Sequence, residues 1–141
     1  RRNGSKTEVY GAEPLLGNDA ARSLKAGKIV ANETEPMTIA DGARTLSLGK
    51  LNWPIIQSGV ADIIEVSEEK IAEAVGLYFG LANLKCEPTG ALSLGALIED
   101  KGRFEAKKIC LVVSGGNVDP EIYADIIAET GSDPIGFLRR R

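Results

Sequence analysis

One stretch of the chain combines a hydroxyl side chain with a flexible backbone at the end of an apolar run. Ser114, Gly115 and Gly116 directly follow residues 108–113, a run that is apolar after its first lysine and suits a central parallel strand. Ligands of open α/β sheets bind beyond the carboxyl ends of such strands. There the Ser114 hydroxyl can hydrogen-bond a ligand, and the paired glycines let the backbone approach a flat one. The same residues also suit a tight turn with positive φ, so both interpretations stay open.

Two single carboxylates stand at positions where a ligand could meet them. Glu87 precedes Pro88 at the start of an apolar stretch, where a buried carboxylate would need a partner. Asp41 precedes Gly42 in a loop that follows apolar residues. The alternatives are a solvated glutamate at the approach to a helix and an Asx-type turn.

A further pair of carboxylates flanks a short loop. Glu13 and Asp19 lie on either side of Gly17, whose carbonyl could join them around a hard cation such as Mg²⁺ or Ca²⁺. The alternative is a helix cap at Asp19 together with a solvated Glu13.

Composition removes several classes of chemistry. The 141 residues include no histidine, which excludes Ser-His-Asp and Cys-His catalysis and every histidine-ligated zinc site. The net charge of −3 does not favour nucleic acid, and no apolar run reaches the length of a membrane span. The two cysteines, Cys86 and Cys110, show no metal or disulfide spacing, so we expect a cytoplasmic protein.

The elements that must position these residues alternate between strand and helix. Residues 8–12, 62–66 and 108–113 predict strands, and residues 28–30 predict a brief extended piece. Helices are predicted over 20–26, from Trp53 onward with Asn52 as its cap, from 68 to 82 after the cap Ser67, from Glu87-Pro88-Thr89 to 98, and after Asp119-Pro120. The pattern indicates an α/β fold with a mainly parallel sheet flanked by helices. We expect one domain over residues 1–141, with a tail at 131–141.

Five motifs in this order carry a resemblance to a known family. They are Thr38-Ile39-Ala40-Asp41-Gly42, Trp53-Pro54-Ile55-Ile56, Val66-Ser67-Glu68-Glu69, Glu87-Pro88-Thr89-Gly90-Ala91 and Val113-Ser114-Gly115-Gly116-Asn117-Val118-Asp119. The series resembles the C-terminal part of the threonine dehydratase and serine racemase family, which are fold type II pyridoxal-phosphate enzymes. The resemblance implies part of the large domain of that fold.

The resemblance also implies roles for single residues. Ser114 is similar to the serine that hydrogen-bonds the pyridine nitrogen of the cofactor, and Gly115, Glu87, Gly42 and Asp41 are similar to residues that line the cofactor pocket. The spacing of Glu13, the Gly17 carbonyl and Asp19 is similar to the divalent-metal site of the serine racemase branch. The implied reaction of the whole enzyme is elimination of water from serine, threonine or a 3-hydroxyaspartate, with release of ammonia.

The chain departs from the family pattern at the covalent anchor and the phosphate site. None of its lysines stands in the family's Schiff-base context, and no run of three glycines could form the phosphate cup. We therefore place no catalytic residue in this chain and expect it to be the C-terminal portion of a dehydratase. The alternatives are a non-catalytic binding or assembly module and, for the full enzyme, serine racemase-like activity. We also expect homo-oligomerisation or association with a missing N-terminal segment.

Overall fold

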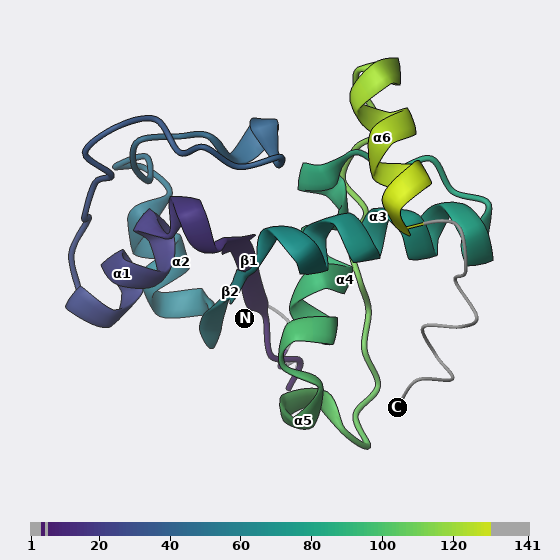
Figure 1. The fold of residues 1–141 in the computed structure, drawn as a ribbon. Coiled ribbons are helices and arrows are strands. Elements are labelled where there is room, and N and C mark those ends of the chain that lie inside the picture. The colour runs from purple at the N-terminus through teal and green to yellow at the C-terminus, as the bar shows by residue number, and fades with distance from the viewer. Residues whose placement is uncertain (1–3, 5, 131–141) are drawn as a thin grey trace.

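The computed structural model describes residue 4 and residues 6–130, and helices dominate that part of the chain (Figure 1). In chain order the elements are β1 (Tyr10–Pro14), the 3₁₀ turn η1 (Leu15–Gly17), α1 (Asp19–Ala26), the 3₁₀ turn η2 (Asp41–Ala43), α2 (Trp53–Gly59), β2 (Asp62–Val66), α3 (Glu68–Ala82), α4 (Pro88–Glu99), α5 (Lys101–Phe104) and α6 (Pro120–Thr130). The tail predicted at 131–141 lies outside the described residues. None of the helices in the described part has the length and apolar character that a membrane crossing needs.

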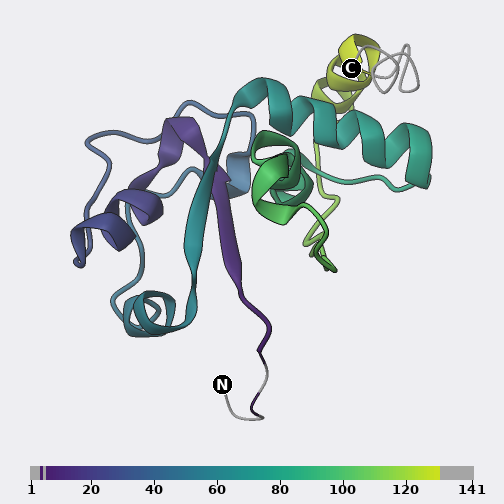
Figure 2. The same cartoon turned by 90° about the horizontal axis from the view of Figure 1, so that it is seen from below.

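The two strands form one parallel pair. Tyr10 lies opposite Asp62, and the register continues to Pro14 opposite Val66. Because α1 and α2 lie on the connection between them, the strands run in the same direction, as the alternating pattern predicts. Figure 2 shows the pair between α1 and α2 on one side and α3 and α4 on the other. The fold is therefore α/β, with a parallel sheet flanked by helices.

The core forms where α4 meets β2 and α3. One cluster of buried residues joins α4 to the sheet, and a second joins it to α3 and α6. α4 is buried on more than one side, because its buried residues contribute to both clusters, as suits a helix that is apolar around most of its circumference. On α3 the apolar residues Ile71, Ala74 and Val75 are fully buried, whereas Leu81 near the end of the helix is 50% exposed. α4 is thus the helix that positions the neighbouring loops.

Helix boundaries follow local signals, although the capping side chains act differently from the prediction. α1 ends at Gly27, whose φ of 68° suits glycine. Asn52 and Ser67 hold the N-cap positions of α2 and α3, but neither side chain makes a capping hydrogen bond. The Ser67 hydroxyl instead donates to Glu99 Oε2 at 2.8 Å, which ties the start of α3 to the end of α4.

Two strand predictions need correction. The first strand is Tyr10–Pro14 and not residues 8–12. Pro14 is its last residue and still lies opposite Val66 in the parallel pair. Residues 28–30, expected as a brief extended piece, belong to no helix and no strand. Residues 108–113, predicted as a central parallel strand, also form none, and Ile109 and Val112 are 43% and 70% exposed. A strand needs a neighbour to bond with, and the described sheet holds only β1 and β2.

Candidate functional site

The predicted ligand-binding residues gather around the N-terminus of α4. Pro88 occupies the first turn of this helix, and Glu87 before it is extended, with φ −73° and ψ 159°. The Glu87 amide donates to the Gly115 carbonyl at 3.1 Å. The Gly42 amide donates to Thr89 Oγ1 at 3.0 Å. Three segments that are distant in sequence therefore meet at one helix end.

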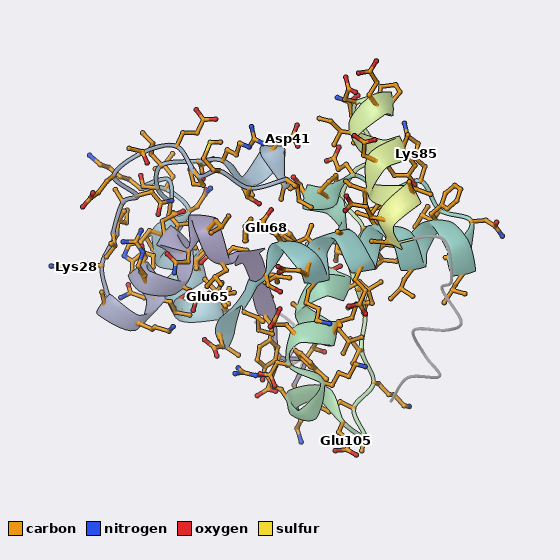
Figure 3. All side chains as sticks on the ribbon, in the orientation of Figure 1. Lys28, Asp41, Glu65, Glu68, Lys85 and Glu105 are labelled. Carbon is orange, nitrogen blue, oxygen red and sulfur yellow. The ribbon has the colours of Figure 1, made fainter. Side chains whose placement is uncertain are left out.

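The loop that carries Asp41 and Gly42 is held by Glu68. One carboxylate oxygen of Glu68 accepts a hydrogen bond from Thr38 Oγ1, and the other accepts one from the Ile39 amide, both at 2.7 Å. In Figure 3, Glu68 lies at the start of α3, below the loop that carries Asp41. In the sequence Glu68 stands out only as an acidic residue in the first turn of a helix, where the helix dipole favours it. Nothing in the local pattern indicates that its partners lie about thirty residues earlier.

Arg44 closes the same loop from its other end. Its Nε and Nη2 donate to the Thr38 carbonyl at 2.8 and 2.7 Å. The Asp41 carboxylate accepts from the amide of the next residue, Gly42, at 2.8 Å, whereas the expected Asx-type turn would bond the amide two residues on. Thr38 is almost fully buried and Ala40 completely so. These contacts fix the backbone that presents Asp41 and Gly42.

The segment that carries Ser114 and Gly115 approaches α4 through glycine. A Cβ atom added to Gly90 would lie 2.6 Å from the Gly115 carbonyl oxygen, so only glycine permits this contact. A Cβ atom on Gly115 would collide with the Glu87 carboxylate. The predicted group of Ser114, Gly115, Glu87, Gly42 and Asp41 is therefore brought together around one helix end.

A cavity of about 810 Å³ adjoins this group. Its wall includes β1, α4, the residues from 107 to 112, and Ser114. Of the five predicted cofactor residues, Ser114 alone lines it, together with Thr89 and Ala43, which the sequence analysis did not assign. Ser114 is exposed, and among the described residues its hydroxyl has no hydrogen-bond partner. A hydroxyl in this position is available to a ligand in the cavity.

The predicted metal residues lie together at the start of α1, where the carboxylates of Glu13 and Asp19 already accept hydrogen bonds from other groups of the protein. The Glu13 carboxylate accepts hydrogen bonds from the amides of Ala20 and Ala21, at 3.1 and 2.6 Å. Asp19 Oδ1 accepts one from Asn32 Nδ2 at 3.1 Å. Burial raises the pKa of Glu13 to about 7, and the nearby Asp19 carboxylate adds to the shift. In the described part of the chain, no group of three histidine, cysteine, aspartate or glutamate residues could hold a metal ion.

The residues around the cavity fit pyridoxal phosphate on the side of its ring nitrogen. The free Ser114 hydroxyl can hydrogen-bond such a nitrogen, and the Glu87 carboxylate is half-buried next to Gly115. The chain supplies no glycine-rich cup for the phosphate group. The arrangement thus suits the ring-nitrogen side of such a cofactor and not its phosphate side.

Comparison with known proteins gives the same family as the five sequence motifs. Residues 1–115 match the family described as pyridoxal-phosphate dependent enzyme. An L-threo-3-hydroxyaspartate ammonia-lyase from Pseudomonas sp is 43% identical over 119 residues, which are 84% of this chain and 37% of that protein. A serine racemase from Schizosaccharomyces pombe is 43% identical over 122 residues, or 86% of this chain and 38% of that protein.

The fold gives the same match. The crystal structure of a threonine deaminase from T.th. superposes with a TM-score of 0.80 at 45% identity, covering 84% of this chain and 43% of that one. The chain therefore spans less than half the length of the relatives that it matches.

Proposed function

Because the chain belongs to the pyridoxal-phosphate dependent enzymes, we propose that it forms part of the cofactor-binding domain of an ammonia-lyase acting on a β-hydroxy amino acid. Relatives named for hydroxyaspartate ammonia-lyase and threonine deaminase support this reaction class. The observation that carries the proposal is that Ser114 lines the cavity and that its hydroxyl has no hydrogen-bond partner among the described residues.

Ser114 would hold the ring nitrogen of the cofactor. When bound, pyridoxal phosphate supplies an electron-accepting ring that stabilises negative charge at the α-carbon of an amino acid. A neutral hydroxyl does not force the ring nitrogen to carry a proton, as a carboxylate would, so Ser114 would moderate that acceptor. The other four predicted cofactor residues, Asp41, Gly42, Glu87 and Gly115, adjoin the cavity without lining it, so they would lie farther from the ring than Ser114.

The proton-transfer and covalent steps require groups from outside this chain. None of its lysines stands in the family's Schiff-base context, so no residue here is assigned as the base. When the chain alone is treated with pyridoxal phosphate and borohydride, peptide mapping should show no dominant modified lysine. A stoichiometric adduct at one lysine would contradict this division of roles.

A chimera tests the reaction class. This chain replaces the matched region of the Pseudomonas L-threo-3-hydroxyaspartate ammonia-lyase, and release of ammonia is measured with 3-hydroxyaspartate, threonine and serine. We expect ammonia from at least one of them. A folded chimera that holds the cofactor but releases no ammonia from any of the three would refute the proposal.

Ser114→Ala in the chimera tests the role of the hydroxyl. The loss of one hydrogen bond to the developing charge should cost about 1 kcal/mol, or roughly fivefold in kcat. Ser93→Ala is the matched control, because Ser93 lines the same cavity but donates to the Val112 carbonyl at 2.9 Å. Equal kcat values for the two variants would remove Ser114 from the mechanism.

A serine racemase-like activity is a second candidate, favoured by the 43% identity to the Schizosaccharomyces pombe serine racemase. The same chimera, given L-serine, distinguishes the two reactions. Formation of D-serine without ammonia favours racemisation, and ammonia with a 2-oxo acid favours elimination.

We further propose a weak divalent-cation site at Glu13, Gly17 and Asp19. Glu13 and Asp19 are 9% and 3% exposed and lie at one helix end, and oxygen ligands suit Mg²⁺ or Ca²⁺. Two carboxylates give an affinity of roughly 10⁻⁴–10⁻³ M. Asp19→Ala should abolish a rise in melting temperature caused by either cation, whereas exposed Glu35→Ala should retain it. Equal responses of both variants would refute the site.

The cellular compartment belongs to the same proposal. The free thiols of Cys86 and Cys110 suit a reducing compartment, and we place the protein in the cytoplasm. Fractionation of cells that express the tagged chain tests this location.

A further inference from the structure

The first turn of α4 receives two contacts from different parts of the chain. Thr89 Oγ1 accepts a hydrogen bond from the Gly42 amide at 3.0 Å. The next residue, Gly90, lies against Gly115, since a Cβ atom added to it would be 2.6 Å from the Gly115 carbonyl oxygen. The loop that contains Gly42 and the segment that contains Gly115 are therefore attached at neighbouring residues of one helix.

Thr89 joins the loop from Thr38 to Arg44 to α4. Among the hydrogen bonds of the described residues, the one from Gly42 to Thr89 is the only one between this loop and α4. The Thr38 end of the loop is held by Glu68, which lies on α3. Loss of the Thr89 hydroxyl would thus release the Gly42 end from α4 while the Thr38 end stays bound.

The fit between Thr89 and Gly42 is close. A Cβ atom built on Gly42 would lie 3.0 Å from Thr89 Oγ1 and 3.2 Å from Thr89 Cγ2, so glycine permits this approach. The hydroxyl forms the hydrogen bond, and the methyl group packs beside it. Substitution of Thr89 by valine or serine therefore separates the hydrogen bond from the packing.

Each of the two attached segments reaches the 810 Å³ cavity through one residue. Ala43, which follows Gly42, lines the cavity, and Ser114, which precedes Gly115, also lines it. Thr89 lies in the same lining. The place at which Gly42 is bonded to α4 therefore decides how far Ala43 lies from Ser114.

We propose that Thr89 is a positioning residue, which holds Gly42 on α4 and thereby sets the separation of Ala43 from Ser114 and the width of the cofactor site. The cofactor ring is flat and rigid, and a misplacement of about 1 Å in a site can cost about a hundredfold in rate. The inference rests on the proposed binding of the cofactor and not on the ammonia-lyase reaction.

A contact that serves stability alone is the competing explanation. Such a contact would change how firmly the loop is held but not how the cofactor is bound. The test therefore combines a measurement on the chain alone with two measurements on the cofactor in the chimera.

Amide exchange in the chain alone tests the hydrogen bond. In Thr89→Val we expect exchange at Gly42 to accelerate about fivefold, the effect of one lost neutral hydrogen bond. Thr89→Ser should retain the wild-type rate, because its hydroxyl can accept the same bond. Exchange at Ile39 should stay the same in both variants, since that amide is bonded to Glu68. Thr45→Val is the matched control, because Thr45 is exposed.

The chimera with the Pseudomonas L-threo-3-hydroxyaspartate ammonia-lyase tests the width of the site. We expect Thr89→Val to raise the Kd for pyridoxal phosphate about fivefold. It should also change the visible circular dichroism of the bound cofactor, which depends on how the protein holds the ring. Thr89→Ser and Thr45→Val should keep the wild-type Kd and spectrum. Far-UV circular dichroism checks that each variant is folded at the temperature of the measurement.

Three results would overturn the inference. They are unchanged exchange at Gly42 in Thr89→Val, an unchanged Kd and spectrum in that variant, and equal losses in Thr89→Val and Thr89→Ser. A folded wild-type chimera that binds no pyridoxal phosphate would refute the proposed function and this inference with it. A chimera that binds the cofactor but releases no ammonia would refute only the proposed reaction.

Discussion

Two irregular segments flank the N-terminus of α4, and they differ in how firmly the chain holds them. In the loop from Thr38 to Arg44, Thr38 and Ala40 are buried. The Glu68 carboxylate and the Arg44 guanidinium both form hydrogen bonds with Thr38. The segment from 108 to 116 is bonded through Ser93 to Val112 and through Glu87 to Gly115, while most of its apolar side chains stay exposed. The first segment is thus fixed by partners within the chain, and the second is fixed mainly where it meets α4.

The difference shows which part of the candidate site this chain can build by itself. Asp41 and Gly42 lie on a loop whose polar groups are bonded on both sides. Ser114 lies beyond a segment that has the composition of a strand and lacks a strand's neighbour. We therefore expect changes near Gly90 and Glu68 to be costly in the isolated chain, and changes in residues 108–113 to be tolerated.

The largest loss of stability is expected in the first part of α4, which both segments contact. Gly90→Ala would place a Cβ atom 2.6 Å from the Gly115 carbonyl oxygen, a backbone atom that cannot rotate away. We expect a loss of about 3 kcal/mol in the free energy of unfolding, measured by urea denaturation. Gly59→Ala is the control, since a Cβ atom there meets nothing within 4 Å. Equal stability of the two variants would show that the 114–116 segment moves aside freely.

Removing one charge should loosen only the first segment. Glu68→Gln keeps the size of the side chain but weakens its hydrogen bonds to Thr38 and Ile39, which should cost about 2 kcal/mol. Amide exchange at Ile39 and Gly42 should accelerate, while that of residues 109–113 stays the same. Exposed Glu69→Gln should change neither. Unchanged exchange at Ile39 in Glu68→Gln would mean that Glu68 does not hold the loop.

The alkylation rates of two thiols compare the start of α4, next to which Cys86 lies, with the second segment, which contains Cys110. Burial raises the pKa of the Cys86 thiol to about 11, and the neighbouring Glu87 charge adds to the shift. Since the thiolate is the reactive form, alkylation of Cys86 should rise roughly tenfold per pH unit up to about pH 11. Mass spectrometry of iodoacetamide-treated protein should show Cys110, which is exposed, labelled first at pH 8. Faster labelling of Cys86 would contradict this order.

The smallest effect is expected in the second segment itself. Val112→Lys replaces a side chain that is 70% exposed, so the free energy of unfolding of the isolated chain should change by less than about 0.5 kcal/mol. A loss above about 1 kcal/mol would show that residues 108–113 pack within this chain, and the contrast between the two segments would fail.

Local patterns in the sequence suffice for most of the helices and for β2. The spacing of Ile71, Ala74 and Val75 fixes the buried face of α3, and Gly27 fixes the end of α1, because both depend on neighbours within one or two turns. The five motifs together indicate the family, and the match over residues 1–115 confirms it. These features need no knowledge of which segments meet in space.

Contacts between distant segments depend on the tertiary structure. Glu68 and Thr38 lie thirty residues apart, and Glu13 reaches the amides at the start of α1, so no local period predicts these bonds. Residues 108–113 show the opposite case: their composition predicts a strand, but a strand exists only beside a partner that supplies its hydrogen bonds. Composition sets what a segment can become, and the neighbours that the fold brings to it decide which form it takes.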